Sequence, residues 1–269
     1  MLGLRRLLLR WHARTGRLVV LPSVYSPQLD NRRDLFVYVP APAPAPAPAP
    51  AARARGDARY PVIYMHDGQN LFDPATSFAG AWGVDEALAW ASRRGLDAIV
   101  VGIPNMGAAR IGEYNPFGEA GDGYLDFVIH TVKPLVDAQF PTLPDRRHTG
   151  IAGSSMGGLI SMYAFFRYSE SFGFAAALSP SLWFADGALL DLVARAPRVS
   201  GRLYLDVGMR EGQQTVALGR RLRDLLLAKG YEAGRDFRWV EDKDGVHHES
   251  AWGRRFREAL PFLLREPAA

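Results

Sequence analysis

The sequence predicts a single α/β domain built on an eight-stranded, mostly parallel sheet with helices on both faces. From Tyr60 onward, apolar runs of strand length alternate with amphipathic stretches of helical length. Such an alternation is typical of right-handed βαβ units, which place their strands in one parallel sheet. The chain has 269 residues, of which 48% are hydrophobic, and this is enough to form one large core.

Two strands precede this alternation. Residues 17–25 and 34–39 are rich in Val, Leu, Phe and Tyr, and the turn-forming residues between them predict a strand pair. We therefore treat residues 1–16 as an N-terminal extension and residues 17–269 as the domain. Residues 40–56 are rich in Pro and Ala, and the prolines fix φ and remove amide donors, so we expect an extended surface loop there.

The remaining strands and helices follow from hydrophobic periodicity. The six further strands are predicted over residues 61–66, 98–103, 149–153, 174–178, 203–207 and 237–240. The helices are predicted over residues 83–93, 124–139, 157–168, 215–229 and 250–264. Together with the opening pair, this gives eight strands.

The amino-acid composition excludes several classes of function. The chain has no Cys, which excludes disulfides, thiolate metal sites and a Cys nucleophile, and we expect neither a metal nor an organic cofactor. The net charge of +4 comes mainly from Arg residues spread along the chain, which predicts no nucleic-acid partner. No apolar window reaches 18 residues, and Arg5, Arg6 and Arg10 interrupt the apolar N-terminus. We therefore expect a cytoplasmic enzyme with no membrane span; the oligomeric state is not predicted.

One motif points to a nucleophile. The segment Gly153-Ser154-Ser155-Met156-Gly157 fits G-x-S-x-G and lies where a predicted strand ends and a helix begins. The sharp turn of this motif lifts the Ser155 hydroxyl into a cleft and places the Met156 amide at a helix N-terminus, where it can stabilise an oxyanion. The sequence therefore predicts Ser155 as the nucleophile of an α/β-hydrolase. The alternative is a Gly- and Ser-rich turn without a chemical role.

A serine nucleophile needs a histidine to accept its proton and a carboxylate to orient that histidine. In this fold the three follow in the order Ser, acid, His. Of the six histidines, only His247 and His248 lie after the last predicted strand. Glu211 lies just past the strand over residues 203–207, whereas Asp206 is still within it. We prefer Glu211 as the acid and keep Asp206 as the alternative.

Three segments carry a family resemblance. The stretches Tyr60–Asn70, Gly153–Gly158 and His247–Trp252 resemble the Putative esterase family of α/β-hydrolases. That family includes esterase D, the enterochelin esterases, the feruloyl esterase domains and the mycolyltransferases of the antigen 85 group. The similarity runs from about Ser26 to Leu264.

The resemblance implies roles for single residues. In the family the catalytic His typically stands five residues before a Trp, which selects His247 because Trp252 follows it at that spacing. The family's acid follows a strand-Gly-x-x-Asp/Glu pattern that ends here at Glu211, although Asp is commoner at that position. The segment after the strand over residues 61–66 implies the Gln69 amide as the second oxyanion donor beside that of Met156.

The resemblance also suggests substrate-binding residues. Arg110, Glu113 and Tyr114 look like family positions, and we expect Arg110 and Tyr114 to shape the wall of the pocket. A buried Arg–Glu ion pair is an equally good interpretation. Trp183 is expected to line the acyl or alcohol pocket, with core packing as the alternative.

The resulting hypothesis is a serine hydrolase that cleaves a small-molecule carboxylic ester or thioester through an acyl-enzyme on Ser155. His247 would act as general base and Glu211 as the orienting acid. Two alternatives stay open at this point: an acyltransferase that uses the same triad, and a non-catalytic binding protein of the same fold. Siderophore, feruloyl and small thioester substrates are all compatible with the sequence.

Overall fold

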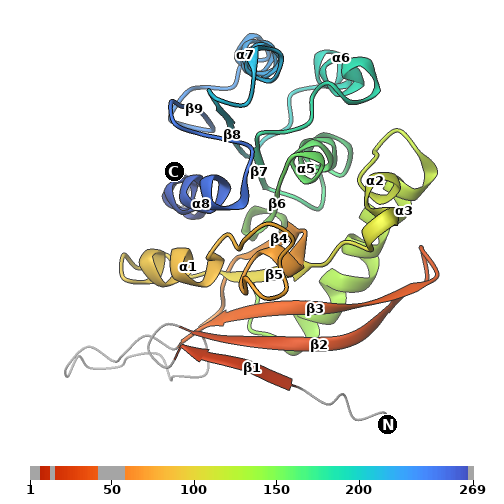
Figure 1. Ribbon diagram of the computed structural model, residues 1–269, viewed down its shortest axis with the longest axis vertical. Coiled ribbons are helices and arrows are strands. Elements are labelled where there is room, and N and C mark those ends of the chain that lie inside the picture. Colours follow the sequence, from red (N-terminus) through yellow and green to blue (C-terminus); the bar gives the residue numbers. More distant parts are fainter. Residues whose placement is uncertain (1–6, 13–15, 42–57, 266–269) are drawn as a thin grey trace.

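The computed structural model describes residues 7–12, 16–41 and 58–265, and these form one sheet covered by helices (Figure 1). Within the described residues the sheet has nine strands in the order β1-β2-β3-β5-β4-β6-β7-β8-β9. Three antiparallel strands lie at one edge, namely β1 (Leu7–His12), β2 (Gly16–Ser26) and β3 (Asn31–Pro40). The six parallel strands are β4 (Val62–His66), β5 (Ile99–Ile103), β6 (Thr149–Ser154), β7 (Phe174–Leu178), β8 (Arg202–Gly208) and β9 (Phe237–Asp242).

Helices cover both faces of the sheet (Figure 1). One face carries α1 (Val84–Ser92) and α8 (Glu249–Leu264). The other carries α3 (Glu119–Phe127), α4 (Lys133–Gln139), α5 (Met156–Arg167), α6 (Ala188–Arg195) and α7 (Gln213–Ala228). A short helix, α2 (Arg110–Glu113), follows β5.

Each face of the parallel sheet packs into its own hydrophobic cluster. Strand β4 is buried along its whole length. Its successive side chains alternate, so that Val62 and Tyr64 face one cluster while Ile63 and Met65 face the other. Burial on both faces explains why the sequence shows continuous apolar runs here rather than polar–apolar alternation.

The structure confirms the predicted α/β architecture and contains all eight predicted strands. The ninth strand, β1, comes from the stretch 1–16 that was expected to be an extension. The predicted helix over residues 124–139 begins at Glu119 and passes through a π-helical turn, Val128–Val132, before α4. Pro134 explains this turn, because it has no N–H to continue an α-helical ladder. Helix α6 was not predicted, and residues 42–56 of the predicted Pro-Ala loop lie outside the described residues.

Two further observations concern the described part of the chain. None of its helices is both long and apolar enough to cross a lipid bilayer. No three of its His, Asp or Glu side chains are grouped as ligands of a metal ion would be.

Candidate active site

The turn between β6 and α5 holds Ser155 in a strained conformation. Its φ of 56° and ψ of −122° belong to a region that residues with a side chain rarely adopt. Two hydrogen bonds from neighbouring segments fix this turn. Ser155 N donates to Leu178 O at 3.0 Å, and Ser155 O accepts from Ser181 N at 3.0 Å. The strained backbone is therefore held in place by the end of β7.

Glycines on either side of Ser155 allow the backbone to pack closely. A Cβ atom at Gly153 would lie 2.8 Å from the backbone carbon of Gly157 and 2.8 Å from His66 Cδ2. A Cβ atom at Gly157 would lie 3.1 Å from His66 Cβ. The small residues of the motif thus let β6, α5 and the end of β4 approach one another beneath Ser155.

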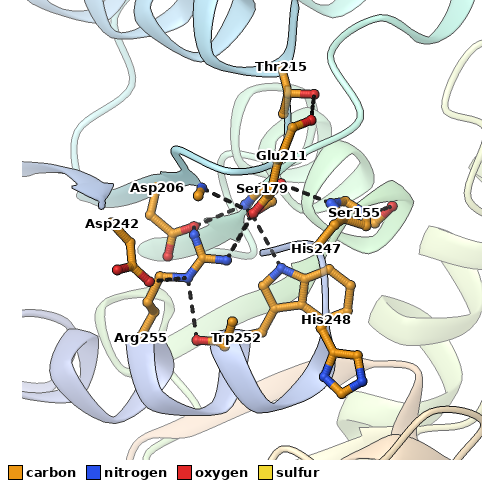
Figure 2. A network of polar contacts seen from close by, with 12 residues as sticks. Ser155, Ser179, Asp206, Glu211, Thr215, Asp242, His247, His248, Trp252 and Arg255 are labelled. Carbon is orange, nitrogen blue, oxygen red and sulfur yellow. Dashed lines mark hydrogen bonds and ion pairs between the residues drawn. The ribbon is translucent and has the colours of Figure 1, made fainter. Parts of the chain in front are cut away.

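His247 bridges Ser155 and Glu211 (Figure 2). Its Nε2 atom lies 3.0 Å from Ser155 Oγ, and its Nδ1 atom lies 2.9 Å from Glu211 Oε2. His247 comes from the loop between β9 and α8, and Glu211 from the segment after β8, so three separate segments supply the three side chains. With the proton on Nδ1, the imidazole donates to the carboxylate and accepts from the hydroxyl.

Glu211 is buried, whereas His247 is open to solvent. The side chain of Glu211 is 1% exposed and that of His247 is 44% exposed. Burial alone would raise the pKa of the Glu211 carboxyl, but the hydrogen bonds from His247 and Ser179 and the nearby charge of Arg255 hold it below its usual range. Glu211 is therefore ionised at neutral pH and can stabilise a positively charged His247.

The alternative residues do not join this group. His248 is exposed and points away from Ser155 in Figure 2, and its Nδ1 accepts from Ser250 N at the start of α8. Asp206 accepts from Ser179 N and pairs with Arg255 rather than with a histidine. Burial, only partly offset by Arg255, raises the pKa of Asp206 to about 7. The structure thus brings Glu211 and His247 to Ser155, and not Asp206 or His248.

Two backbone amides lie at the same edge of the sheet as Ser155. Gln69 is in a short turn, Gly68–Asn70, directly after β4, and Met156 is the first residue of α5 after β6. Strands β4 and β6 are neighbours in parallel register. Met156 N has no acceptor within its helix, and among the described residues Gln69 N donates to no other atom. Both N–H groups are therefore available to a bound molecule.

Arg110 and Tyr114 both contact Asp67, which directly precedes the turn that carries Gln69. The Arg110 guanidinium binds both Asp67 carboxylate oxygens, at 2.7 and 2.8 Å, and Asp67 N donates to Tyr114 Oη at 3.0 Å. Tyr114 is completely buried. Glu113 forms a buried ion pair with Arg33, at 2.8 Å, and not with Arg110. The contacts seen for Arg110 and Tyr114 therefore orient the segment that carries Gln69.

Exposed apolar side chains lie in the segments that follow the carboxyl ends of the parallel strands. Trp183, after β7, is 55% exposed and not packed into the core. Eight large hydrophobic side chains of the described residues are exposed, and six of them follow the carboxyl ends of parallel strands, as Ser155 does. The six are Phe78, Ile111, Phe117, Trp183, Met209 and Val246. Exposed apolar groups concentrated in this way are typical of a binding surface.

Three residues that contact Ser155 or Glu211 were not predicted from the sequence. Ser181 Oγ lies 3.1 Å from Ser155 Oγ, and Ser179 and Arg255 both contact Glu211. Two signals were available. The Ser-Pro-Ser segment directly follows a predicted strand, and Arg255 shares the apolar face of its helix with Trp252 at a spacing of three residues.

Comparison with known proteins identifies a family and several relatives. The family model described as Putative esterase matches residues 26–263. The protein YbbA of Bacillus subtilis, which is uncharacterised, is 25% identical over 76% of this chain and 85% of its own length. The siderophore triacetylfusarinine C esterase of Aspergillus fumigatus is 34% identical over 48% of this chain and 46% of its own length.

Solved structures share the fold. The enterobactin esterase FES of Shigella flexneri has a TM-score of 0.70 at 20% identity, covering 93% of this chain. The chain spans only 59% of that enzyme. The BES protein of Bacillus cereus has a TM-score of 0.69 at 20% identity and is covered completely, together with 99% of this chain.

Proposed function

The chain belongs to the Putative esterase family and is a carboxylic ester hydrolase, and we propose that it acts through a covalent acyl-enzyme on Ser155. One observation carries the proposal: His247 lies within hydrogen-bond distance of both Ser155 Oγ and Glu211 Oε2. A nucleophile, a base and an orienting acid in this arrangement are what acyl transfer requires.

The reaction follows from these positions. Ser155 Oγ adds to the ester carbonyl while its proton passes to His247 Nε2, and the Glu211 carboxylate stabilises the imidazolium. The amides of Gln69 and Met156 donate to the oxyanion of the tetrahedral intermediate. Collapse of the intermediate expels the alcohol, which takes the proton from His247. Water, deprotonated by the same histidine, then attacks the acyl-enzyme and releases the acid and the free Ser155.

The surroundings of Ser155 favour a bulky substrate. Apolar side chains such as Phe117 and Trp183 stand exposed in the loops around it, and His247 is open to solvent. Such a site suits an ester with large apolar or aromatic groups. Because a relative is named for a siderophore ester, we propose siderophore-type and phenolic esters as the substrate class.

Hydrolysis of an ester panel tests the proposal. Wild type and Ser155→Ala would be compared on p-nitrophenyl esters of increasing chain length and on catechol and phenolic esters. We expect hydrolysis by wild type only, with higher kcat/KM for the aromatic esters. Equal rates for both proteins would contradict the role of Ser155, and a preference for acetate would contradict the substrate class. Adding an alcohol acceptor shows whether acyl transfer competes with hydrolysis.

A further inference from the structure

Ser179, at the end of β7, has an unusual backbone for its residue type. Its φ is 45°, in the left-handed region that glycine adopts without strain. Two contacts to one residue hold it there, because Ser179 N lies 3.1 Å from Asp206 O and 3.0 Å from Asp206 Oδ1. A glycine would fit this backbone better, so the presence of a side chain here suggests that the hydroxyl has a use.

The surroundings of the Ser179 hydroxyl determine where its proton points. Ser179 Oγ lies 2.6 Å from Glu211 Oε1, 3.0 Å from Arg255 Nη2 and 3.3 Å from Trp252 Nε1 (Figure 2). Arg and Trp side chains can only donate, whereas an ionised carboxylate can only accept. The hydroxyl therefore accepts twice and donates its one proton to Glu211, which saturates its hydrogen-bonding capacity.

Arg255 contributes a buried positive charge to the same place. Its side chain is 1% exposed on α8, and its guanidinium lies 3.0 Å from Asp206 Oδ1, 3.3 Å from Glu211 Oε1 and 3.8 Å from Asp242 Oδ2. The surrounding carboxylates offset the cost of burying the guanidinium charge, and this charge in turn stabilises the ionised form of the carboxylates.

These contacts divide the two oxygens of Glu211 between different partners. Oε1 accepts from Ser179 Oγ, Arg255 Nη2 and Gly208 N, the last at 3.0 Å, whereas Oε2 has a hydrogen bond only with His247 among the residues that the structure describes. Helix α8 also places Trp252 edge-on against the His247 ring, at 4.8 Å between ring centres. One side of the carboxylate is thus fixed by donors, and the other is left for the imidazole.

We propose that Ser179 and Arg255 are positioning residues for the reaction, which fix the orientation of Glu211 so that Oε2 faces His247. Neither residue contacts Ser155, and both act through Glu211. This inference rests on the proposed esterase function. It adds that the acid depends on a serine directly after β7 and on an arginine of α8, whereas the acid itself follows β8.

Ser179→Gly is the informative variant, because it removes the hydroxyl while relieving the backbone strain. The relief of strain should offset part of the stability lost with the hydrogen bonds, so we expect the variant to remain folded at the assay temperature. We expect kcat to fall about 10- to 100-fold, the range for a lost hydrogen bond to a charged group. KM should stay within about twofold if the hydroxyl does not touch the substrate. Without this donor the carboxylate is more basic, so the acidic limb of the pH–rate profile should move to higher pH.

Ser23→Gly supplies the matched control. Ser23 is an exposed residue of β2 with a φ of 54°, so the same substitution relieves the same kind of strain far from Glu211. We expect it to leave kcat and the pH profile unchanged. Arg255→Lys, which keeps the charge, should retain more activity than Arg255→Met.

The experiment distinguishes failure of the positioning role from failure of the proposed esterase activity. If wild type hydrolyses esters and Ser179→Gly keeps kcat within fivefold and the same pH profile, the positioning role is wrong. A rise in KM at unchanged kcat would equally overturn it. If wild type hydrolyses no ester, the proposed function fails first. Should the Arg255 variants not fold, the comparison of Ser179→Gly with Ser23→Gly still decides.

Discussion

Replacing Glu211 with Gln should reduce kcat/KM by about 10⁴-fold, the loss known for a carboxylate-to-amide change in a serine protease triad. Two effects add up to this loss. The first is electrostatic. At the observed 2.9 Å and an effective dielectric constant of about 20, the Glu211–His247 attraction amounts to about 6 kcal/mol. Because His247 is 44% exposed, we halve this value for screening, to about 3 kcal/mol or about 10²-fold in rate.

The second effect is a wrong tautomer of His247. Oε1 of Glu211 accepts from Ser179, Arg255 and Gly208, so a Gln side chain would place its amide oxygen there. Its NH₂ group would then face His247 Nδ1, which must become an acceptor. The imidazole proton would move to Nε2, where it blocks the transfer of a proton from Ser155.

The assay is kcat/KM on a p-nitrophenyl ester, with the unfolding temperature measured to confirm that each variant is folded. Asp206→Asn is the comparison, since Asp206 was the alternative acid and does not contact His247. We expect that variant to lose less than about tenfold, because it removes no interaction with the histidine. The reasoning is refuted if folded Glu211→Gln keeps more than a tenth of the wild-type activity, or if Asp206→Asn falls as far.

Three further predictions concern the same region. His247→Ala should lower kcat/KM at least about 10³-fold, whereas His248→Ala should keep activity and lose about 1 kcal/mol of stability with its helix cap; equal losses of activity would contradict the assignment. Burial lowers the pKa of His66 from 6.5 to about 4. Between these two values the unfolded chain binds a proton that the folded protein does not, so the free energy of unfolding decreases as pH falls from 6.5 to about 4. Urea unfolding at pH 7 and pH 4 should show wild type losing about 3 kcal/mol more than His66→Gln, and equal losses would contradict it. Gly153→Ala should cost about 1–3 kcal/mol because its Cβ would lie 2.8 Å from backbone, whereas the open Gly112→Ala should be nearly neutral; a neutral Gly153→Ala would contradict the tight packing.

The sequence predicted the sheet and the segments at its carboxyl edge because both depend on local patterns. The parallel strands are apolar throughout, and the G-x-S-x-G turn joins one of them to a helix. Strand β1 was missed because Arg10 and the short apolar run around it resemble an extension as much as an edge strand. Helix α6 spans only eight residues, too few for a clear helical period.

The candidate site was predictable for the residues that follow a motif or a strand end. Ser155, Glu211 and His247 fall into this group. Ser179 also follows a strand end, and Arg255 lies three residues after Trp252 on its helix, but their contacts with Glu211 depend on the packing of α8 against β7 and β8, which no local pattern reports. For Arg110, spacing alone did not indicate its partner, and the structure pairs it with Asp67 instead of Glu113.

Trapping the acyl-enzyme tests the central claim most directly. Wild type would be mixed with a p-nitrophenyl ester, quenched in acid during turnover and analysed by intact-protein and peptide mass spectrometry. We predict one acyl group per chain, located on Ser155, and none on folded Ser155→Ala. An acyl group on another residue, or product release with no acyl group on Ser155 at any quench time, would contradict the account.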